Sequence, residues 1–350
     1  MTEHTTVSPM SLMTIAAGFR RARLLAVAVE LGTFDALDRA PSGTTVRNFA
    51  AATNLPVRTA QLLLDGCVGL GIITRKDLGT GETLFSNSTV AAEFLVRGTR
   101  YFFGDYLLLN DFRGYQGWMT LADAIRTDTP TSWPNQQPLS AHRDPAAAHA
   151  MSRGALDPGT RWTASVIARS FDFSESRSVL DLGGGIGAYC LELAEHYPSL
   201  RFTLFDQPNK IDIAAENLST RSNGEPRFEL VAGDFWRDPI PTGHGIVLLS
   251  NILADWSDED VVTLTARCRA AVEPGGAIVV AETFFDDATK STPETAVMHG
   301  IHMILETHSG RNRTREEYCT LLSEAGFRHV DTHDLLETAP GANGLLIARP

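Results

Sequence analysis

The spacing of apolar positions divides the chain into two parts. In the first hundred residues, apolar side chains recur at helical spacing, as in LLAVAVELGTFDAL (24–37), which is interrupted at Gly32. Residues 44–75 predict two helices and a short strand, and TLFSNS (83–88) predicts a second strand. Two helices followed by a two-stranded wing are typical of a winged helix-turn-helix.

From residue 178 onward, short aliphatic and β-branched runs alternate with helical segments. Five runs have the length of buried strands, namely SVLDL, RFTLFD, RFELVAGD, GIVLLSN and AIVVAE. The tail, HVDTHDLLE followed by GLLIARP, predicts a closing hairpin. We therefore expect an α/β fold with a doubly wound, mostly parallel sheet behind an N-terminal helical winged-helix region.

Charge and composition narrow the class of partner. The chain has 350 residues, with 42 acidic and 30 Lys or Arg side chains and a formal net charge of -12, which disfavours nucleic acid. The second predicted helix of this winged helix-turn-helix, 57–69, has Arg58 as its only basic residue. We therefore expect a role in dimerisation or as a substrate lid rather than in DNA binding. The absence of a leader pattern and of a membrane-length apolar run predicts a cytoplasmic protein. The four cysteines are widely spaced, which favours reduced thiols over a zinc site.

A glycine-rich stretch, LDLGGGIGAYC (180–190), follows the first predicted strand of the sheet. Glycines at that place let a ligand rest on bare backbone at a helix N-terminus. The third glycine of a dinucleotide GxGxxG motif is replaced by Cys190, and no P-loop pattern is present. Asp181 would repel a pyrophosphate, so the stretch favours a ligand with cationic character, approached closely at Gly183, Gly185 and Gly187.

Two further carboxylates follow the next strands. Asp206 lies 21 residues after Gly185, a spacing at which an acid accepts hydrogen bonds from both ribose hydroxyls. Asp234 and Phe235 follow the third strand, where an acid and an aromatic ring suit an adenine. Three acids, a nucleoside and no phosphate predict S-adenosylmethionine, whose sulfonium and ammonium groups are positive. Tight-turn glycines and helix-capping aspartates are the structural alternative.

The motifs VLDLGGGIG, LFDQP, GDFW, ADWSDED, GGAIVVAE and GRNRT…LLSEAGF resemble, in this order, those of the small-molecule O-methyltransferase family, which includes plant caffeate-type, acetylserotonin and bacterial natural-product enzymes. The resemblance covers nearly the whole chain. It implies a homodimeric S-adenosylmethionine-dependent methyltransferase that acts on a small specialised metabolite, as in antibiotic biosynthesis. It also implies a winged-helix dimerisation domain over 1–105, linker helices capping the acceptor pocket over 106–165, and a cofactor-binding domain over 166–350. The expected cofactor contacts are Asp181, Gly183, Gly185, Asp206, Gln207, Asp234, Phe235, Ser250, Asn251 and Trp256.

The acceptor side departs from the family pattern. The family's general base is a histidine in an HDW triplet, whereas this chain reads Ala254-Asp255-Trp256. Of the two glutamates that usually orient that histidine, the first matches Glu282 and the second position holds Asn312. A positioned base is worth roughly 10²–10⁴ in rate. Alignment alone supplies roughly 7–11 kcal/mol, so an acceptor that arrives ionised could still react.

Candidate replacements gather in MHGIHMILETHSG. His299 and His302 are three residues apart on a predicted helix and share a face, which the resemblance places with Met303 along the acceptor pocket. The two imidazoles are candidates for a base, for a metal site completed by Glu282, Asp255 or a substrate chelate, or for local hydrogen bonds only. The candidate catalytic residues are therefore His299, His302, Glu282 and Asp255, and the candidate acceptor contacts are His149, Met151 and Met303.

Three further functions compete with O-methylation. The missing base and the histidine pair favour C-methylation of a 2-oxo acid or of an activated aromatic carbon. Another possibility keeps the sulfonium as an electrostatic catalyst for hydroxylation, decarboxylation or a pericyclic step, without methyl transfer. A transcription regulator that uses the winged helix is the last alternative.

Overall fold

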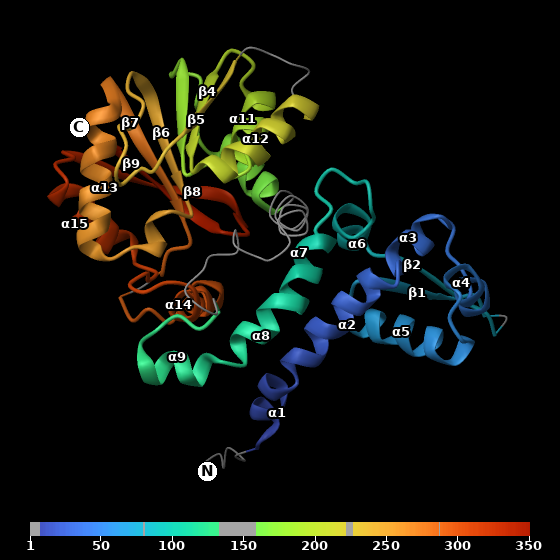
Figure 1. Cartoon of the computed structure of the whole chain (residues 1–350). Helices are drawn as coiled ribbons and strands as arrows, with labels where there is room; N and C mark the ends of the chain where they lie inside the picture. The colour runs from blue at the N-terminus through green and yellow to red at the C-terminus, as the bar shows by residue number, and fades with distance from the viewer. Residues whose placement is uncertain (1–7, 80, 133–158, 222–226, 287) are drawn as a thin grey trace, which may run out of the picture. The chain divides into compact units, whose positions relative to one another are not determined.

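The computed structural model describes residues 8–79, 81–132, 159–221, 227–286 and 288–350. Two compact units make up the chain, Met1–Tyr115 and Gln116–Pro350 (Figure 1). The predicted segment 1–105 lies within the first unit, and the predicted segment 106–165 spans the division between the two. No helix in these described ranges is long and apolar enough to cross a membrane.

The first unit contains the winged helix-turn-helix that the sequence predicts. Its two-stranded wing pairs antiparallel, with Ile73 opposite Asn87, and the predicted break at Gly32 has a left-handed φ of +65°. Phe34, Phe49 and Leu64 lie in its core. Its elements are α1 (Met10–Ala16), α2 (Gly18–Glu30), α3 (Thr33–Asp38), α4 (Val46–Thr53), α5 (Val57–Gly69), β1 (Ile73–Asp77), β2 (Thr83–Asn87), α6 (Thr89–Phe94), α7 (Gly104–Leu109) and the π-turn η1 (Asn110–Gly114).

The second unit is built on a seven-stranded sheet with the order β5-β4-β3-β6-β7-β9-β8. The pairs from β5 to β7 are parallel, and β9 is antiparallel to both β7 and β8. All seven runs predicted as strands are strands, and the mixed, mostly parallel α/β class is confirmed. The strands are β3 (Ser178–Leu182), β4 (Arg201–Asp206), β5 (Phe228–Ala232), β6 (His244–Ser250), β7 (Val272–Glu282), β8 (His329–Ala339) and β9 (Ala342–Arg349).

Both faces of this sheet are covered by helices. Alternate strand residues point to opposite faces, so Val179 joins one apolar core and its neighbour Leu180 joins the other. The first core includes the helix over 159–170, α11 (Ala188–His196) and α12 (Pro208–Arg221); the second includes α13 (Asp258–Ala271) and α15 (Arg315–Glu324). Burial on both faces explains why the strands read as near-continuous apolar runs.

The carboxyl ends of β3, β6 and β7 lie side by side because Asp181 pairs with Leu248 and Ser250 pairs with Ala281. The strand order reverses between β3 and β6, which is where open α/β sheets bind ligands.

Beyond the strand ends, the short helices α8 (Tyr115–Trp118) and α9 (Leu121–Thr127) precede a segment whose Thr131 N–H donates to the carbonyl of Leu305 on α14 (Glu294–Glu306). Helix α14 is separate from the helices that cover the sheet (Figure 1).

Candidate active site

The glycine loop after β3 has the backbone conformation that its composition predicts. Gly183, Gly185 and Gly187 have φ angles of +73°, +57° and +80°, a region that other residues rarely adopt. A Cβ at Gly183 would collide with Ile252, whereas a Cβ at Gly185 would meet nothing within 4 Å. Gly185 is therefore the part of the loop that leaves open space for a ligand.

Asp206, at the end of β4, is hydrogen-bonded to the tip of this loop. Its Oδ2 accepts the N–H of Gly185 at 2.8 Å, and its Oδ1 accepts the N–H of Gln207 at 2.6 Å. Burial raises the pKa of Asp206, and these two hydrogen bonds act in the opposite direction. Asp206, which we expect to bind the ribose, therefore lies directly beside Gly185, where we expect the ligand to approach the backbone most closely.

Asp181 is buried beneath the loop rather than exposed at its surface. The residue is 2% exposed, accepts a hydrogen bond from the Cys190 thiol at 3.4 Å, and lies 2.6 Å from the position of a Cβ at Gly184. Burial, with a smaller contribution from Asp206, raises the pKa of Asp181 to about 7. A cation bound over the loop would favour the ionised form of Asp181. This carboxylate is therefore suited to a sulfonium or ammonium group.

Aromatic side chains gather next to Asp234. Trp256 packs edge-on against Phe235 and Trp236, with ring centroids 5.9 and 4.8 Å apart. Asp234 Oδ1 accepts the N–H of Trp236 at 2.8 Å. The sequence analysis did not single out Trp236, although its place in the GDFW motif was the available signal. These rings form an apolar wall suited to a flat heterocycle.

The turn after β6 holds two more predicted cofactor contacts. Asn251 has a φ of +53°, and its N–H donates to the carbonyl of Ala281 on the neighbouring strand at 3.0 Å. Its side-chain amide lies 3.4 Å from the Ser250 hydroxyl. Ser250 ends β6 and Asn251 follows it, at the same edge of the sheet as Asp181 near the end of β3.

Glu282, at the end of β7, holds the backbone of this same turn. Its Oε1 accepts the N–H groups of Ile252, Leu253 and Ala254 at 3.0, 2.8 and 3.4 Å. Burial, followed by the carboxylate of Asp255, raises the pKa of Glu282 to about 8. In the described structure Glu282 thus fixes the main chain around Ala254, and neither of its oxygens makes a hydrogen bond to an imidazole.

Asp255 is an exposed carboxylate beside Ala254. It lies in the turn η4 (Leu253–Asp255). Desolvation by the surrounding protein, followed by the charge of Glu306, raises the pKa of Asp255 to about 6. A solvent-accessible carboxyl group with a raised pKa can accept and release a proton near neutral pH.

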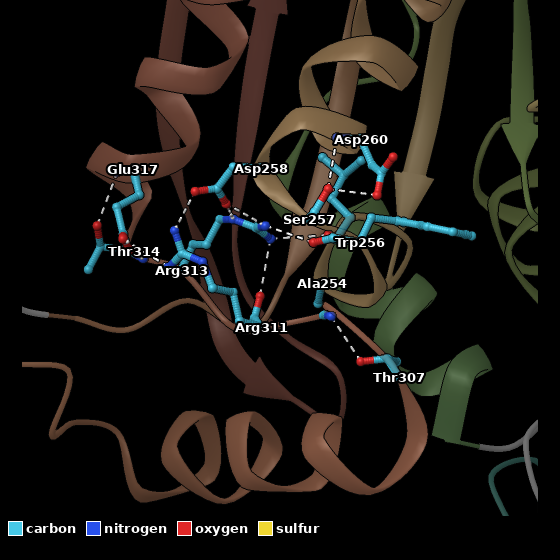
Figure 2. A network of polar contacts seen from close by, with 12 residues as sticks. Ala254, Trp256, Ser257, Asp258, Asp260, Thr307, Arg311, Arg313, Thr314 and Glu317 are labelled. Atoms are coloured by element: carbon cyan, nitrogen blue, oxygen red, sulfur yellow. Dashed lines mark hydrogen bonds and ion pairs between the residues drawn. The ribbon is translucent and has the colours of Figure 1, made fainter. Parts of the chain in front are cut away.

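Arg313 fastens the Ala254 segment to the loop that precedes α15 (Figure 2). Its buried guanidinium donates to the carbonyls of Leu253 and Trp256 at 3.2 and 2.7 Å and to Asp258 at 2.7 Å. The partly exposed Arg311 also reaches Asp258, at 2.8 Å. The ends of β6 and β7 and the loop over 307–314 are therefore one connected polar network.

The two histidines of α14 have different partners. His299 Nδ1 lies 2.7 Å from Asn312 Oδ1. The His302 ring stacks on Trp118 at 6.4 Å between centroids, and its Nε2 lies 3.7 Å from Glu306. The spacing predicted a shared face, but the structure gives each imidazole its own chemical surroundings.

The remaining candidates are placed as follows. Met303 is buried on α14, with 5% exposure. His149 and Met151 lie outside the described residues. Among the residues that are described, no three His, Cys, Asp or Glu side chains gather as a metal site requires.

Comparison with known proteins places this geometry in a family. Residues 118–328 match the O-methyltransferase domain, and residues 13–97 match the O-methyltransferase dimerisation domain. The chain is 33% identical to 3-hydroxy-5-methyl-1-naphthoate 3-O-methyltransferase of Streptomyces sahachiroi, over 97% of this chain and 94% of the relative. It is 30% identical to the tetracenomycin polyketide synthesis 8-O-methyl transferase of Streptomyces glaucescens, over 95% of both chains.

A solved structure agrees with this assignment. Human N-acetylserotonin methyltransferase, crystallised in complex with S-adenosylmethionine, superposes with a TM-score of 0.84 at 28% identity, over 100% of this chain and 99% of that one. The glycine loop, Asp181 and Asp206 suit the same cofactor. The chain therefore belongs to the O-methyltransferase family, with its dimerisation domain, and is an S-adenosylmethionine-dependent methyltransferase.

Proposed function

We propose that this enzyme methylates a hydroxyl group on a small aromatic natural product. The proposal rests mainly on the hydrogen bond from the Gly185 N–H to Asp206, beside the open space at Gly185. This bond places a carboxylate suited to the cofactor's ribose next to backbone that the cofactor can approach closely. The naphthoate and tetracenomycin enzymes, which align over nearly their full length, support an aromatic acceptor.

Each end of the cofactor has a proposed set of contacts. Asp206 accepts hydrogen bonds from the ribose hydroxyls, and Phe235 and Trp256 pack on the adenine, whose amino group donates to Asp234. Asp181 balances the positive methionine end. The bound cofactor supplies an electrophilic methyl group, and the chain's own residues bind, orient and exclude water. The proposed contacts also include Gly183, Gln207, Ser250 and Asn251.

We also propose that the enzyme works as a homodimer through its N-terminal unit. Helix α1 buries none of its residues, and the apolar side chains Met10, Leu12, Met13 and Ile15 are all more than half exposed. An exposed apolar helix in a segment that matches a dimerisation domain is best explained by burial in a partner subunit. Sedimentation velocity, with Leu12→Glu and Ile15→Glu introduced together, tests this: the double variant should sediment as a monomer.

Metal-assisted C-methylation has less support than O-methylation. His299 and His302 have separate partners, and the described residues hold no third ligand beside them. Incubation with excess chelator separates the two hypotheses, because only a metal-assisted reaction would stop.

The main test uses S-adenosylmethionine with a panel of hydroxylated 1-naphthoates and larger hydroxylated polycyclic aromatics. We expect one S-adenosylhomocysteine per product, and a product whose new methyl group is attached to oxygen by NMR. A methyl group on carbon would contradict O-methylation. Turnover without S-adenosylhomocysteine would instead favour a reaction that keeps the cofactor intact.

A further inference from the structure

The side-chain amide of Asn312 has a fixed orientation. Its Nδ2 lies 3.2 Å from the carbonyl oxygen of Thr283 and 2.9 Å from that of Ala296. Carbonyl oxygens only accept hydrogen bonds, so the NH₂ group must face them both. The amide oxygen of Asn312, which is 3% exposed, must therefore face His299.

This orientation determines the tautomer of His299. The amide oxygen of Asn312 can only accept, so His299 Nδ1, 2.7 Å away, must carry the proton that it donates. In the neutral ring the lone pair is then on Nε2, and Nε2 makes no hydrogen bond to any residue in the described ranges. The ring thus presents a proton acceptor with its other nitrogen anchored, as in a base that is oriented by a second residue.

The surroundings of His299 keep the ring neutral. Burial lowers its pKa below the usual value, and the hydrogen bond to Asn312 opposes this only in part. The nearest cations on the neighbouring loop, Arg311 and Arg313, are both paired with Asp258. Among the described residues, the other charged or titratable groups of the surrounding elements are Glu294, His302 and Glu306 on α14, His308 after it, Asp123 and Arg126 on α9, Asp255 after β6, and Glu282 and Asp286 at and beyond the end of β7.

Asn312 connects this imidazole to the carboxyl edge of the sheet. Thr283, which accepts from Asn312, directly follows β7, and the same loop reaches the carbonyls of Leu253 and Trp256 through Arg313. Figure 2 shows this loop lying against the Ala254 turn. Asn312 thus joins His299 to the same loop that holds the Ala254 turn.

We propose that His299 is the general base that takes the acceptor's hydroxyl proton, and that Asn312 is the residue that positions it. This inference rests on the proposed O-methylation. The acceptor oxygen gives its proton to Nε2 and forms a bond to the methyl carbon as the carbon–sulfur bond breaks. The products are the methyl ether, S-adenosylhomocysteine and an imidazolium, which then returns its proton to solvent.

The decisive experiment compares His299→Gln with the matched variant His308→Gln, which changes an exposed histidine on the following loop, across hydroxynaphthoates of decreasing hydroxyl pKa. With the least acidic acceptor, we expect His299→Gln to lower kcat by about 10²–10⁴-fold, the usual worth of a positioned base. The loss should shrink toward nothing with acceptors that are ionised at the assay pH. His308→Gln should stay within about threefold of the parent, and both variants should bind S-adenosylmethionine normally by calorimetry.

A second variant tests the positioning role of Asn312 without removing the imidazole. Asn312→Asp places a carboxylate beside Nδ1, which should raise the pKa of His299 and move the acidic limb of kcat upward by about one pH unit. A merely structural role would lower activity at every pH without moving that limb.

The outcomes separate the two proposals. Full activity of His299→Gln with the least acidic acceptor, or a loss that is the same for every acceptor, would overturn the base while leaving O-methylation standing. An unmoved acidic limb in Asn312→Asp would overturn the positioning role. Failure of the parent enzyme to methylate any hydroxyl in the panel would instead count against the proposed function itself.

Discussion

The two halves of the sheet's carboxyl edge differ in how they are built. On the side of β3, β4 and β5, the polar groups pair with residues at their own or the adjacent strand end, as Asp206 does with Gln207 and with Gly185 of the adjoining glycine loop. On the side of β6 and β7, the polar groups hold loops that are distant in sequence: Glu282 holds the amides over 252–254, and Arg313 holds the carbonyls of Leu253 and Trp256, which are 60 and 57 residues away. The first half is a local cofactor site, whereas the second is a tertiary assembly whose chemistry can be rearranged.

The largest expected effect comes from replacing Arg313, which holds together the side of β6 and β7; we call this side the acceptor half and the side of β3, β4 and β5 the cofactor half. Arg313→Met leaves the carbonyls of Leu253 and Trp256 without their donor, and we expect a loss of about 3 kcal/mol in the free energy of unfolding. For a unit of this size that corresponds to a fall of roughly 6–12 °C in Tm. Arg311→Met, which removes two partly exposed ion pairs, should cost less than about 1 kcal/mol. Equal losses in thermal unfolding of the two variants would contradict this assignment.

The next effect belongs to the cofactor half. Asp206→Ala removes the ribose acceptor and the partner of the Gly185 amide, so we expect the Kd for S-adenosylmethionine to rise about 100-fold, as for the loss of charged hydrogen bonds. Asp212→Ala, an exposed carboxylate on α12, is the matched control and should leave calorimetric binding unchanged. Normal affinity in Asp206→Ala would place the ribose elsewhere.

A pH titration sharpens the comparison within the cofactor half. Asp181 has a pKa raised to about 7 by burial, and a positively charged ligand requires its ionised form. The carboxyl must therefore lose a proton on binding below pH 7, and the Kd should rise about tenfold between pH 8 and pH 6. Asp181→Asn should flatten this dependence. A parent enzyme with a flat profile would mean that the carboxylate does not meet the cofactor's charge.

The smallest effect concerns Glu282 in the acceptor half. Its folded-state pKa is raised to about 8, above the 4.5 of an ordinary glutamate, so the folded protein holds this proton more tightly than the unfolded chain. Stability contributed by the protonated group is therefore lost as pH rises from about 4.5 through 8. Glu282→Gln keeps an acceptor for the three amides and cannot ionise. We expect it to be about 1 kcal/mol more stable than the parent at pH 9 and to lose this advantage near pH 5. A constant difference at all pH values would show that Glu282 does not titrate in this range.

In the acceptor half, the sequence predicted which residues are candidates but not which residues they contact. Helical spacing placed His299 and His302 on one face, yet it gave no means of telling which imidazole was anchored. Asn312 was recognised only as a changed residue, because its partners at positions 283 and 296 have no fixed sequence relation to it. Trp236 was overlooked for a similar reason, since its contact with Trp256 forms only in the fold.

The amino-acid sequence by itself determined the strands, the left-handed glycines and the carboxylates at the ends of β3 and β4, because strand periodicity and strand-end spacing are local properties of the chain. Only the tertiary structure decided which nitrogen of His299 carries the proton and which backbone Glu282 holds. Those outcomes depend on hydrogen-bond directions between segments that are distant in sequence, and such directions are set when the segments pack.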